Sequence, residues 1–290
     1  MTRREGNLAK WTAGICQANG IDIHYLRTGR DRPPLIALHG LIGSGACLVP
    51  FARTLEDEFD VVLPDARGHG KSSAPSAGYS YGDLAGDVVG LIENLEIKAA
   101  ILLGHSMGGM TAAVCAGRLG STIRAVILVD PTFISSEWQR RVFESDLAHE
   151  HRRLLTSRRS DLLAQARLRS SHRSSEMIEY LVEARLETSI RAFEILTPPN
   201  PDYRELVRTI HVPILLVIGD SGVVTVDTAR ELQTLNPLLR YELISDVGHG
   251  LPYDEPKRLG SVVTSFVQSL DSLETGSAYA KMPPLRREWT

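Results

Sequence analysis

The 290-residue sequence has few cysteines, almost no excess of charge of either sign and no long hydrophobic run. Its three cysteines lie far apart and form no CxxC or Cys/His ligand spacing, so we expect neither a disulfide framework nor a zinc site. The net charge of −3, from 32 Lys and Arg against 35 Asp and Glu, lacks the basic excess that binding to nucleic acid requires.

Membrane spans and export signals are also lacking. No window reaches the ~18 apolar residues of a membrane span, and residues 1–16 contain no apolar stretch of signal-peptide length. We therefore expect a cytoplasmic protein with no nucleic-acid or membrane partner, for which a homodimer is compatible with the sequence. The composition, 43% hydrophobic and 23% charged, is that of a globular chain large enough to fold without a metal or other cofactor.

The pattern of apolar runs predicts an α/β fold with a mostly parallel, eight-stranded sheet flanked by helices. Residues 14–29 read as a hairpin that turns at Asn19-Gly20, a dipeptide suited to positive φ. Apolar runs then alternate with amphipathic segments, which is typical of parallel strands covered by helices. The expected strands are 33–40, 60–65, 99–106, 123–131, 212–220 and 239–249, and the expected helices are 48–59, 81–97, 107–120, 225–235 and 255–270.

This alternation stops between residues 132 and 209. That segment shows helical periodicity over 176–196, contains no strand candidate and ends in the Pro-rich stretch 197–203. We expect an all-helical insertion. The predicted organisation is a core domain in two parts, a helical lid between them and a C-terminal tail, over residues 1–131, 132–209, 210–270 and 271–290.

The strongest local motif is Gly104-His105-Ser106-Met107-Gly108, a GxSxG sequence between an apolar strand and a small-residue helix. Such a turn is sharp, and it exposes the serine Oγ at the carboxyl edge of the sheet. The pentapeptide alone is a weak signal, but its setting between strand and helix favours a nucleophile. At the variable position, His105 is expected to point away from the reacting atom in a packing or hydrogen-bonding role.

Two further features lie where a serine hydrolase needs them. Residues 39–43, a Gly-containing loop after the first parallel strand, could direct a backbone N–H at the same point as the N–H that follows the nucleophile. His249 follows the last strand, where an imidazole could accept the Ser106 proton.

These motifs together resemble those of the α/β-hydrolase superfamily over about residues 14–270. The resemblance rests on LHGLIGSG (38–45), LPDARGHGKS (63–72), GHSMGG (104–109), PILLVIGD (213–220) and DVGHGLP (246–252), in this order. It implies the α/β-hydrolase fold, Ser106 as nucleophile, His249 as base and the N–H groups of Leu41 and Met107 as oxyanion donors. It also implies that residues 132–209 cover the site as a lid.

The acid of the expected triad departs from the common family pattern. In most members it lies about three residues past the glycine that ends the seventh strand, and here that position holds Gly222. The candidates are Asp220, directly after Gly219, and Asp130 at the end of the sixth strand. The second resembles the arrangement in some haloalkane dehalogenases and in the zearalenone lactonases. We favour Asp130, and the sequence leaves Asp220 open.

A serine nucleophile with a histidine base and an oxyanion hole performs acyl transfer, so we expect a hydrolase of carboxylic esters or lactones that needs no cofactor. Apolar side chains of the insertion suggest a small hydrophobic substrate; they are Phe133, Trp138, Phe143, Met177, Tyr180 and Phe193. Two alternatives use the same architecture. One is hydrolysis of a carbon–carbon bond in diketone-like ring-cleavage products, and the other is a ligand receptor without turnover.

Overall fold

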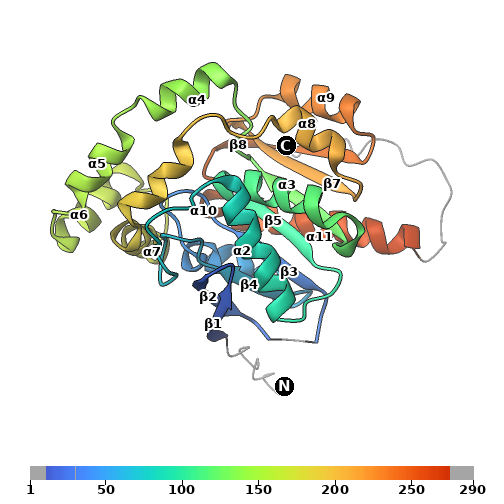
Figure 1. Ribbon diagram of the computed structural model, residues 1–290, viewed down its shortest axis with the longest axis horizontal. Helices are drawn as coiled ribbons and strands as arrows, with labels where there is room; N and C mark the ends of the chain where they lie inside the picture. The colour runs from blue at the N-terminus through green and yellow to red at the C-terminus, as the bar shows by residue number, and fades with distance from the viewer. Residues whose placement is uncertain (1–10, 30, 275–290) are drawn as a thin grey trace, which may run out of the picture.

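A single eight-stranded sheet organises the chain, in the order β1-β2-β4-β3-β5-β6-β7-β8 (Figure 1). The structure, a computed structural model, describes residues 11–29 and 31–274. The β1–β2 and β2–β4 pairs are antiparallel, and all other neighbouring pairs are parallel, which confirms the predicted fold class. The strands are β1 (Thr12–Ala18), β2 (Ile21–Arg27), β3 (Pro34–Leu38), β4 (Asp60–Pro64), β5 (Ile101–His105), β6 (Ala125–Val129), β7 (Ile214–Ser221) and β8 (Leu239–Gly248).

Helices cover both faces of this sheet, which is why β4, β5 and β6 are buried at every position rather than at alternate ones. On one face lie α2 (Tyr81–Asn94), α3 (Met107–Leu119), α8 (Tyr203–Thr209) and α9 (Val226–Leu235) (Figure 1). The opposite face is covered by α1 (Val49–Ala52), α10 (Leu251–Asp254) and α11 (Pro256–Glu274), with the short 3₁₀ turn η1 (Gly45–Leu48) beside them.

The predicted hairpin is confirmed, with Asn19 and Gly20 at φ of 50° and 78° in the turn between β1 and β2. Two predicted helices are shorter than their periodicity indicated. The helix expected over 48–59 ends at Ala52, and the one expected over 176–196 breaks at Thr188, whose backbone is extended. A 3₁₀ turn, η3 (Ile190–Leu196), follows.

Between β6 and β7 the chain forms α4 (Ser136–Phe143), α5 (Leu147–Leu154), α6 (Arg159–Arg169) and α7 (Ser175–Glu187), which lie beside the sheet rather than on it (Figure 1). Helix α8, in the region predicted as lid, instead packs against α3 and α9. Because β6 and β7 are parallel neighbours, a helix on the face of the sheet completes their crossover. It lies within the predicted all-helical insertion, but no periodicity marked it as a separate helix. Most of the predicted tail, residues 275–290, lies outside the described residues.

Close packing of α3 on the sheet depends on glycine. A Cβ atom on Gly104 would lie 2.0 Å from the Gly108 carbonyl oxygen, and one on Gly108 would lie 2.4 Å from the Leu38 carbonyl oxygen and 2.6 Å from that of His39. These neighbours are backbone atoms, which cannot rotate away. The glycines therefore bring β3, β5 and the start of α3 into contact.

We predict that Gly108→Ala lowers the free energy of unfolding by about 3 kcal/mol or more, because the new methyl group overlaps backbone. Gly117→Ala is the matched control in the same helix: its Cβ would meet a rotatable Thr209 hydroxyl at 3.2 Å. Alanine should be neutral or stabilising there. Urea unfolding of the two variants measures the difference, and equal stabilities would contradict the packing argument.

The loop after β4 is organised by the buried carboxylate of Asp65. It accepts hydrogen bonds from the N–H groups of Gly45 (2.7 Å) and Lys71 (3.0 Å) and from Nδ1 of His24 (2.8 Å). Burial alone would raise the pKa of Asp65, but these three bonds, the one from His24 above all, hold it below its ordinary value. Asp65 thereby links the hairpin, η1 and the loop that follows β4.

We predict that Asp65→Asn costs about 1–3 kcal/mol at pH 7, because an amide cannot accept all three bonds. A carboxyl whose folded pKa is lowered stabilises the fold above its unfolded pKa of ~3.9, and this contribution is lost as the pH falls through the folded pKa. The gap between wild type and variant in urea unfolding should therefore shrink below about pH 4. Asp22→Asn, at an exposed position of the same hairpin, should show neither effect.

Candidate active site

Ser106 occupies a strained turn between β5 and α3. Its backbone has φ 55° and ψ −117°, a conformation that non-glycine residues rarely adopt and that costs about 1–3 kcal/mol. The turn is held by a bond from the Ser106 N–H to the Val129 carbonyl (3.1 Å) and by the Thr132 N–H, which donates to the Ser106 carbonyl (3.2 Å). The serine side chain makes no capping bond to α3, so its hydroxyl is free to face another group.

That group is His249, which follows β8. Its Nε2 lies 2.8 Å from Ser106 Oγ, and its Nδ1 lies 2.6 Å from Oδ2 of Asp130. A carboxylate accepts only, so Nδ1 carries the proton and Nε2 is left to accept one from the serine. Three residues that are 24 and 119 positions apart along the chain thus form one continuous hydrogen-bonded series.

Asp130 has no exposed surface and is fixed by backbone as well as by His249. The N–H groups of Val223 and Val224, at the end of β7, donate to its carboxylate at 2.9–3.0 Å. A Cβ atom on Gly222 would lie only 2.7 Å from both Asp130 carboxylate oxygens. The glycine at the usual position of the family's acid therefore leaves the space that the Asp130 carboxylate fills.

Asp220, the alternative acid, faces elsewhere. Its carboxylate accepts bonds from the N–H groups of Asp246 (2.8 Å) and Val247 (3.2 Å), and these bonds lower its pKa. Asp246 has a positive φ of 60°, and the β7–β8 register shifts at this point. Asp220 thus stabilises an irregular stretch of β8, and the structure brings Asp130 to the His249 ring instead.

The two predicted oxyanion donors flank the serine. Met107 N begins α3, and neither it nor Leu41 N has a hydrogen-bond partner in the part of the chain that the structure describes. The Leu41 loop is close to the nucleophile, since a Cβ atom on Gly40 would lie 3.1 Å from that of Ser106. Two unpaired N–H groups beside a serine hydroxyl suit a developing oxyanion.

Two buried histidines hold this loop. His39 donates from Nδ1 to the Gly40 carbonyl (2.8 Å) and accepts from the Ala66 N–H (3.0 Å). His69 donates to the Arg67 carbonyl (2.9 Å) and faces the Ile42 N–H at 3.4 Å. Burial lowers the pKa of His39 and lowers that of His69 to about 3, so both rings are neutral and each can donate and accept.

His105 does not simply point away from the site. Its ring lies 4.9 Å from that of His249, and its Nε2 lies 2.7 Å from the His249 carbonyl oxygen. This agrees with the hydrogen-bonding role expected of His105, but the sequence contains no signal for the partner, which is 144 residues away.

The six side chains predicted to bind substrate are not gathered at one place. Phe133 follows Thr132 beside the serine turn and stacks on Tyr203 with ring centroids 5.0 Å apart, whereas Trp138 and Phe143 are 39% and 49% exposed on α4. Trp138 lines an open depression formed by α4 and the start of α5. The other three are packed, wholly or in part, within the described residues: Met177, Tyr180 and Phe193. Their role as substrate contacts stays a prediction.

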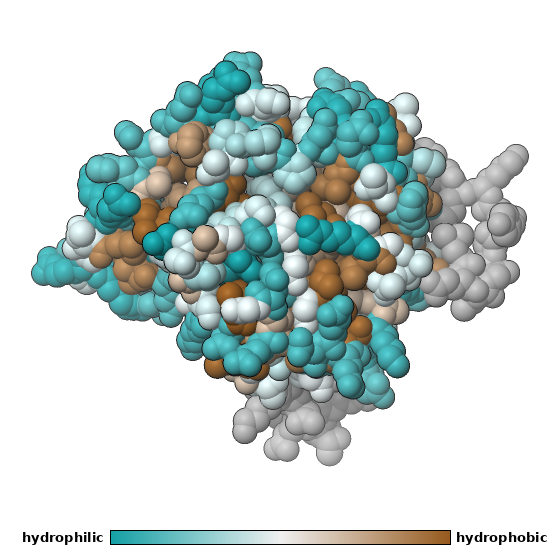
Figure 2. All heavy atoms as spheres, in the orientation of Figure 1, coloured by the Kyte–Doolittle hydropathy of each residue, from teal (hydrophilic) through white to brown (hydrophobic). Residues whose placement is uncertain are grey.

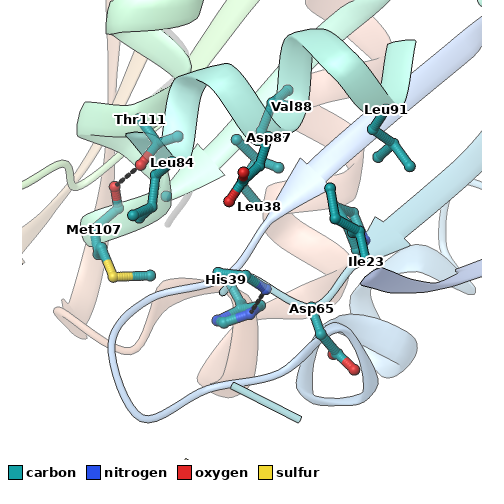
Figure 3. A pocket seen from close by; sticks show the side chains of 13 residues that line it. Ile23, Leu38, His39, Asp65, Leu84, Asp87, Val88, Leu91, Met107 and Thr111 are labelled. Atoms are coloured by element: carbon teal, nitrogen blue, oxygen red, sulfur yellow. Dashed lines mark hydrogen bonds between the residues drawn. The ribbon is translucent and has the colours of Figure 1, made fainter. Parts of the chain in front are cut away.

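A small cavity of about 30 Å³ lies behind the serine turn, between the sheet and the helices α2 and α3 (Figure 3). Leu84 and Met107 border it on one side and Ile23 and Leu91 on the other. The other residues that line it are mostly apolar.

Within residues 11–29 and 31–274, no cluster of three His, Cys, Asp or Glu side chains could hold a metal ion. No helix in that part of the chain is both long and apolar enough to cross a membrane.

The chain is similar in sequence to several hydrolases. It is 29% identical to N-formylmaleamate deformylase of Pseudomonas putida over 248 residues, which cover 83% of this chain and 91% of that protein. It is 36% identical to 2-(acetamidomethylene)succinate hydrolase of Mesorhizobium japonicum, but over only 36% of this chain and 38% of that relative.

Solved structures are similar in fold. The crystal structure of E-2-(acetamidomethylene)succinate hydrolase matches with a TM-score of 0.77 at 23% identity, over 89% of this chain and all of that one. The enol-lactonase of Burkholderia xenovorans matches with a TM-score of 0.73 at 24% identity, over 88% of this chain and all of that one. The family model of the alpha/beta hydrolase fold matches residues 33–256. Sheet order, serine turn and family match agree, and the chain belongs to the alpha/beta hydrolase family.

Proposed function

We propose that this hydrolase cleaves a carboxylic ester or lactone through an acyl-enzyme, with Ser106 as nucleophile, His249 as base and Asp130 as the acid that orients it. The observation that carries the proposal is the continuous series of hydrogen bonds from Ser106 Oγ through the His249 ring to Asp130, with distances of 2.8 and 2.6 Å. The names of an enol-lactonase and two esterases among the structural neighbours are compatible with it.

In this mechanism Ser106 Oγ attacks the carbonyl carbon while its proton passes to Nε2 of His249. The carbonyl oxygen becomes an oxyanion, which the N–H groups of Leu41 and Met107 stabilise. His249 then returns the proton to the leaving oxygen as the acyl–oxygen bond breaks. A water molecule, deprotonated by His249, attacks the acyl-enzyme by the same steps in reverse and releases the acid. Asp130 remains ionised and stabilises the transient imidazolium.

The type of bond that the enzyme cleaves follows from the nature of the nucleophile. A serine forms an ester with an acyl group, whereas the halide- and epoxide-cleaving branches of the same family need an aspartate at this position. Two sequence relatives are named for substrates whose acyl groups are attached to nitrogen, so the assay must include formyl and acetyl amides as well as esters and lactones. A dienol-ketone tests the alternative of carbon–carbon bond hydrolysis.

We predict that a fluorophosphonate probe labels the chain at Ser106 and that Ser106→Ala loses about 10⁶-fold in kcat on the substrates that wild type cleaves. Intact-mass spectrometry locates the adduct, and the substrate panel measures turnover. Full activity of Ser106→Ala would refute the proposal. Labelling together with turnover of the dienol-ketone alone would show that the enzyme cleaves a carbon–carbon bond and not an ester. Tight ligand binding without labelling or turnover would favour a receptor.

The identity of the triad acid is tested by removing each candidate carboxylate and by moving one of them to position 222. We predict that Asp130→Asn lowers kcat about 10⁴-fold, as loss of the acid does in other triads, while Asp220→Asn changes it less than about tenfold because the Asp220 carboxylate bonds to backbone N–H groups and not to His249. Because Gly222 adjoins the Asp130 carboxylate, the double variant Asp130→Gly, Gly222→Asp should recover part of the activity that Asp130→Gly alone loses. Collapse of activity in Asp220→Asn would identify the other carboxylate as the acid.

A further inference from the structure

We propose that His105 is a positioning residue for His249: as a neutral imidazole it holds the backbone of the base by a hydrogen bond from the nucleophile turn itself. The inference rests on the proposed function, in which His249 is the base. It adds a role for a residue that takes no part in the proton transfers. The contacts of the ring, its protonation and its surroundings each bear on this role.

The geometry places His105 between the nucleophile and the base. It precedes Ser106 directly, at the end of β5, and its side chain is 3% exposed. Its Nε2 lies 2.7 Å from the His249 carbonyl oxygen, and the two rings are 4.9 Å apart at an interplanar angle of 39°. The same dipeptide thus supplies the nucleophile and fixes the main chain that carries the base.

The bond determines the tautomer of His105. A carbonyl oxygen only accepts, so Nε2 must carry the proton, and a neutral ring then has a lone pair on Nδ1. That Nδ1 is buried, has no hydrogen-bond partner among the described residues, and lies where a Cβ atom on Gly40 would be 3.3 Å away. A buried acceptor without a partner costs free energy, so the Nε2 bond satisfies only one of the two ring nitrogens.

Neutrality matters because of the distance between the rings. Burial, and then the proximity of His249, lower the pKa of His105 to about 3, so the ring stays uncharged at neutral pH. In the proposed mechanism His249 becomes positive in each acyl-transfer step. A second cation 4.9 Å away would oppose this charge, whereas a neutral donor can hold the backbone without doing so.

A second contact secures the same loop. The ring of Tyr253, on α10, meets His105 edge-on with centroids 5.3 Å apart. The next residue, Asp254, accepts bonds from Arg173 of the insertion at 2.6 and 3.0 Å. The segment after His249 is therefore held from the nucleophile turn, through His105, on one side and from the insertion, through Arg173, on the other.

The test compares His105→Gln with His105→Asn and His105→Leu. The amide nitrogen of glutamine can reach the place of Nε2, whereas that of asparagine reaches only the place of Nδ1 and leucine has no donor. We expect kcat to fall about 30-fold in the Asn and Leu variants at nearly unchanged KM, and Gln to recover most of it. The rate of labelling by the fluorophosphonate should fall by the same factor, because labelling also needs an oriented base.

Equal kcat in all three variants would overturn the inference, as would a loss that appears only in KM. A measurement on the unmutated protein does not depend on variant folding. In ¹⁵N NMR of histidine-labelled protein, with His105→Gln identifying the signal, His105 should be a neutral Nε2–H tautomer from pH 8 down to pH 5. Titration within that range, or the Nδ1–H tautomer, contradicts the proposal. Failure of these tests while Ser106 is still labelled refutes the role of His105 alone, and absence of labelling refutes the proposed function.

Discussion

The structure depends on the contact between α3 and the sheet at the turn after β5. Glycines at positions 104 and 108 let strand and helix meet at backbone distance, and this contact forces Ser106 into a conformation of positive φ. The same strain that destabilises the turn lifts the serine hydroxyl from the helix, presents the Met107 N–H and directs the His105 ring toward His249. One local constraint therefore arranges a hydroxyl, a backbone donor and a neighbouring imidazole.

Around this turn the chain uses backbone groups to orient side chains. Asp130 is held by two N–H groups that follow β7, and the loop beside Ser106 is held by neutral histidines that bond to carbonyl and N–H groups. Burial keeps these rings uncharged, which suits a site where a positive charge is expected to form only on His249. Figure 2 shows one face, on which hydrophilic side chains and hydrophobic areas are intermixed. The apolar side chains that build the framework are buried.

The family match covers residues 33–256, from just before β3 to the start of α11, and the acid of the site involves two points within this range. The carboxylate that contacts the histidine follows β6, and Gly222 lies at the position where the resemblance places the acid of most members. Either strand end reaches the same volume, because β6 and β7 are parallel neighbours whose carboxyl ends meet at one edge. Exchange of the acid between them needs no change of fold.

The sequence by itself determined the sheet, the hairpin, the serine turn and the histidine after the last strand, because each is encoded by a short pattern of apolar periodicity or glycine placement. It could not decide between Asp130 and Asp220, since both end a strand and their directions depend on neighbouring backbone. The sequence also did not predict helix α8, because its packing against α3 and α9 outweighs the Pro-rich neighbourhood. Nor did it predict the break at Thr188, because helical periodicity does not mark the change from an α-helix to a 3₁₀ turn. The partner of His105 was likewise settled only by tertiary structure, which brings together residues 144 positions apart that no local pattern connects.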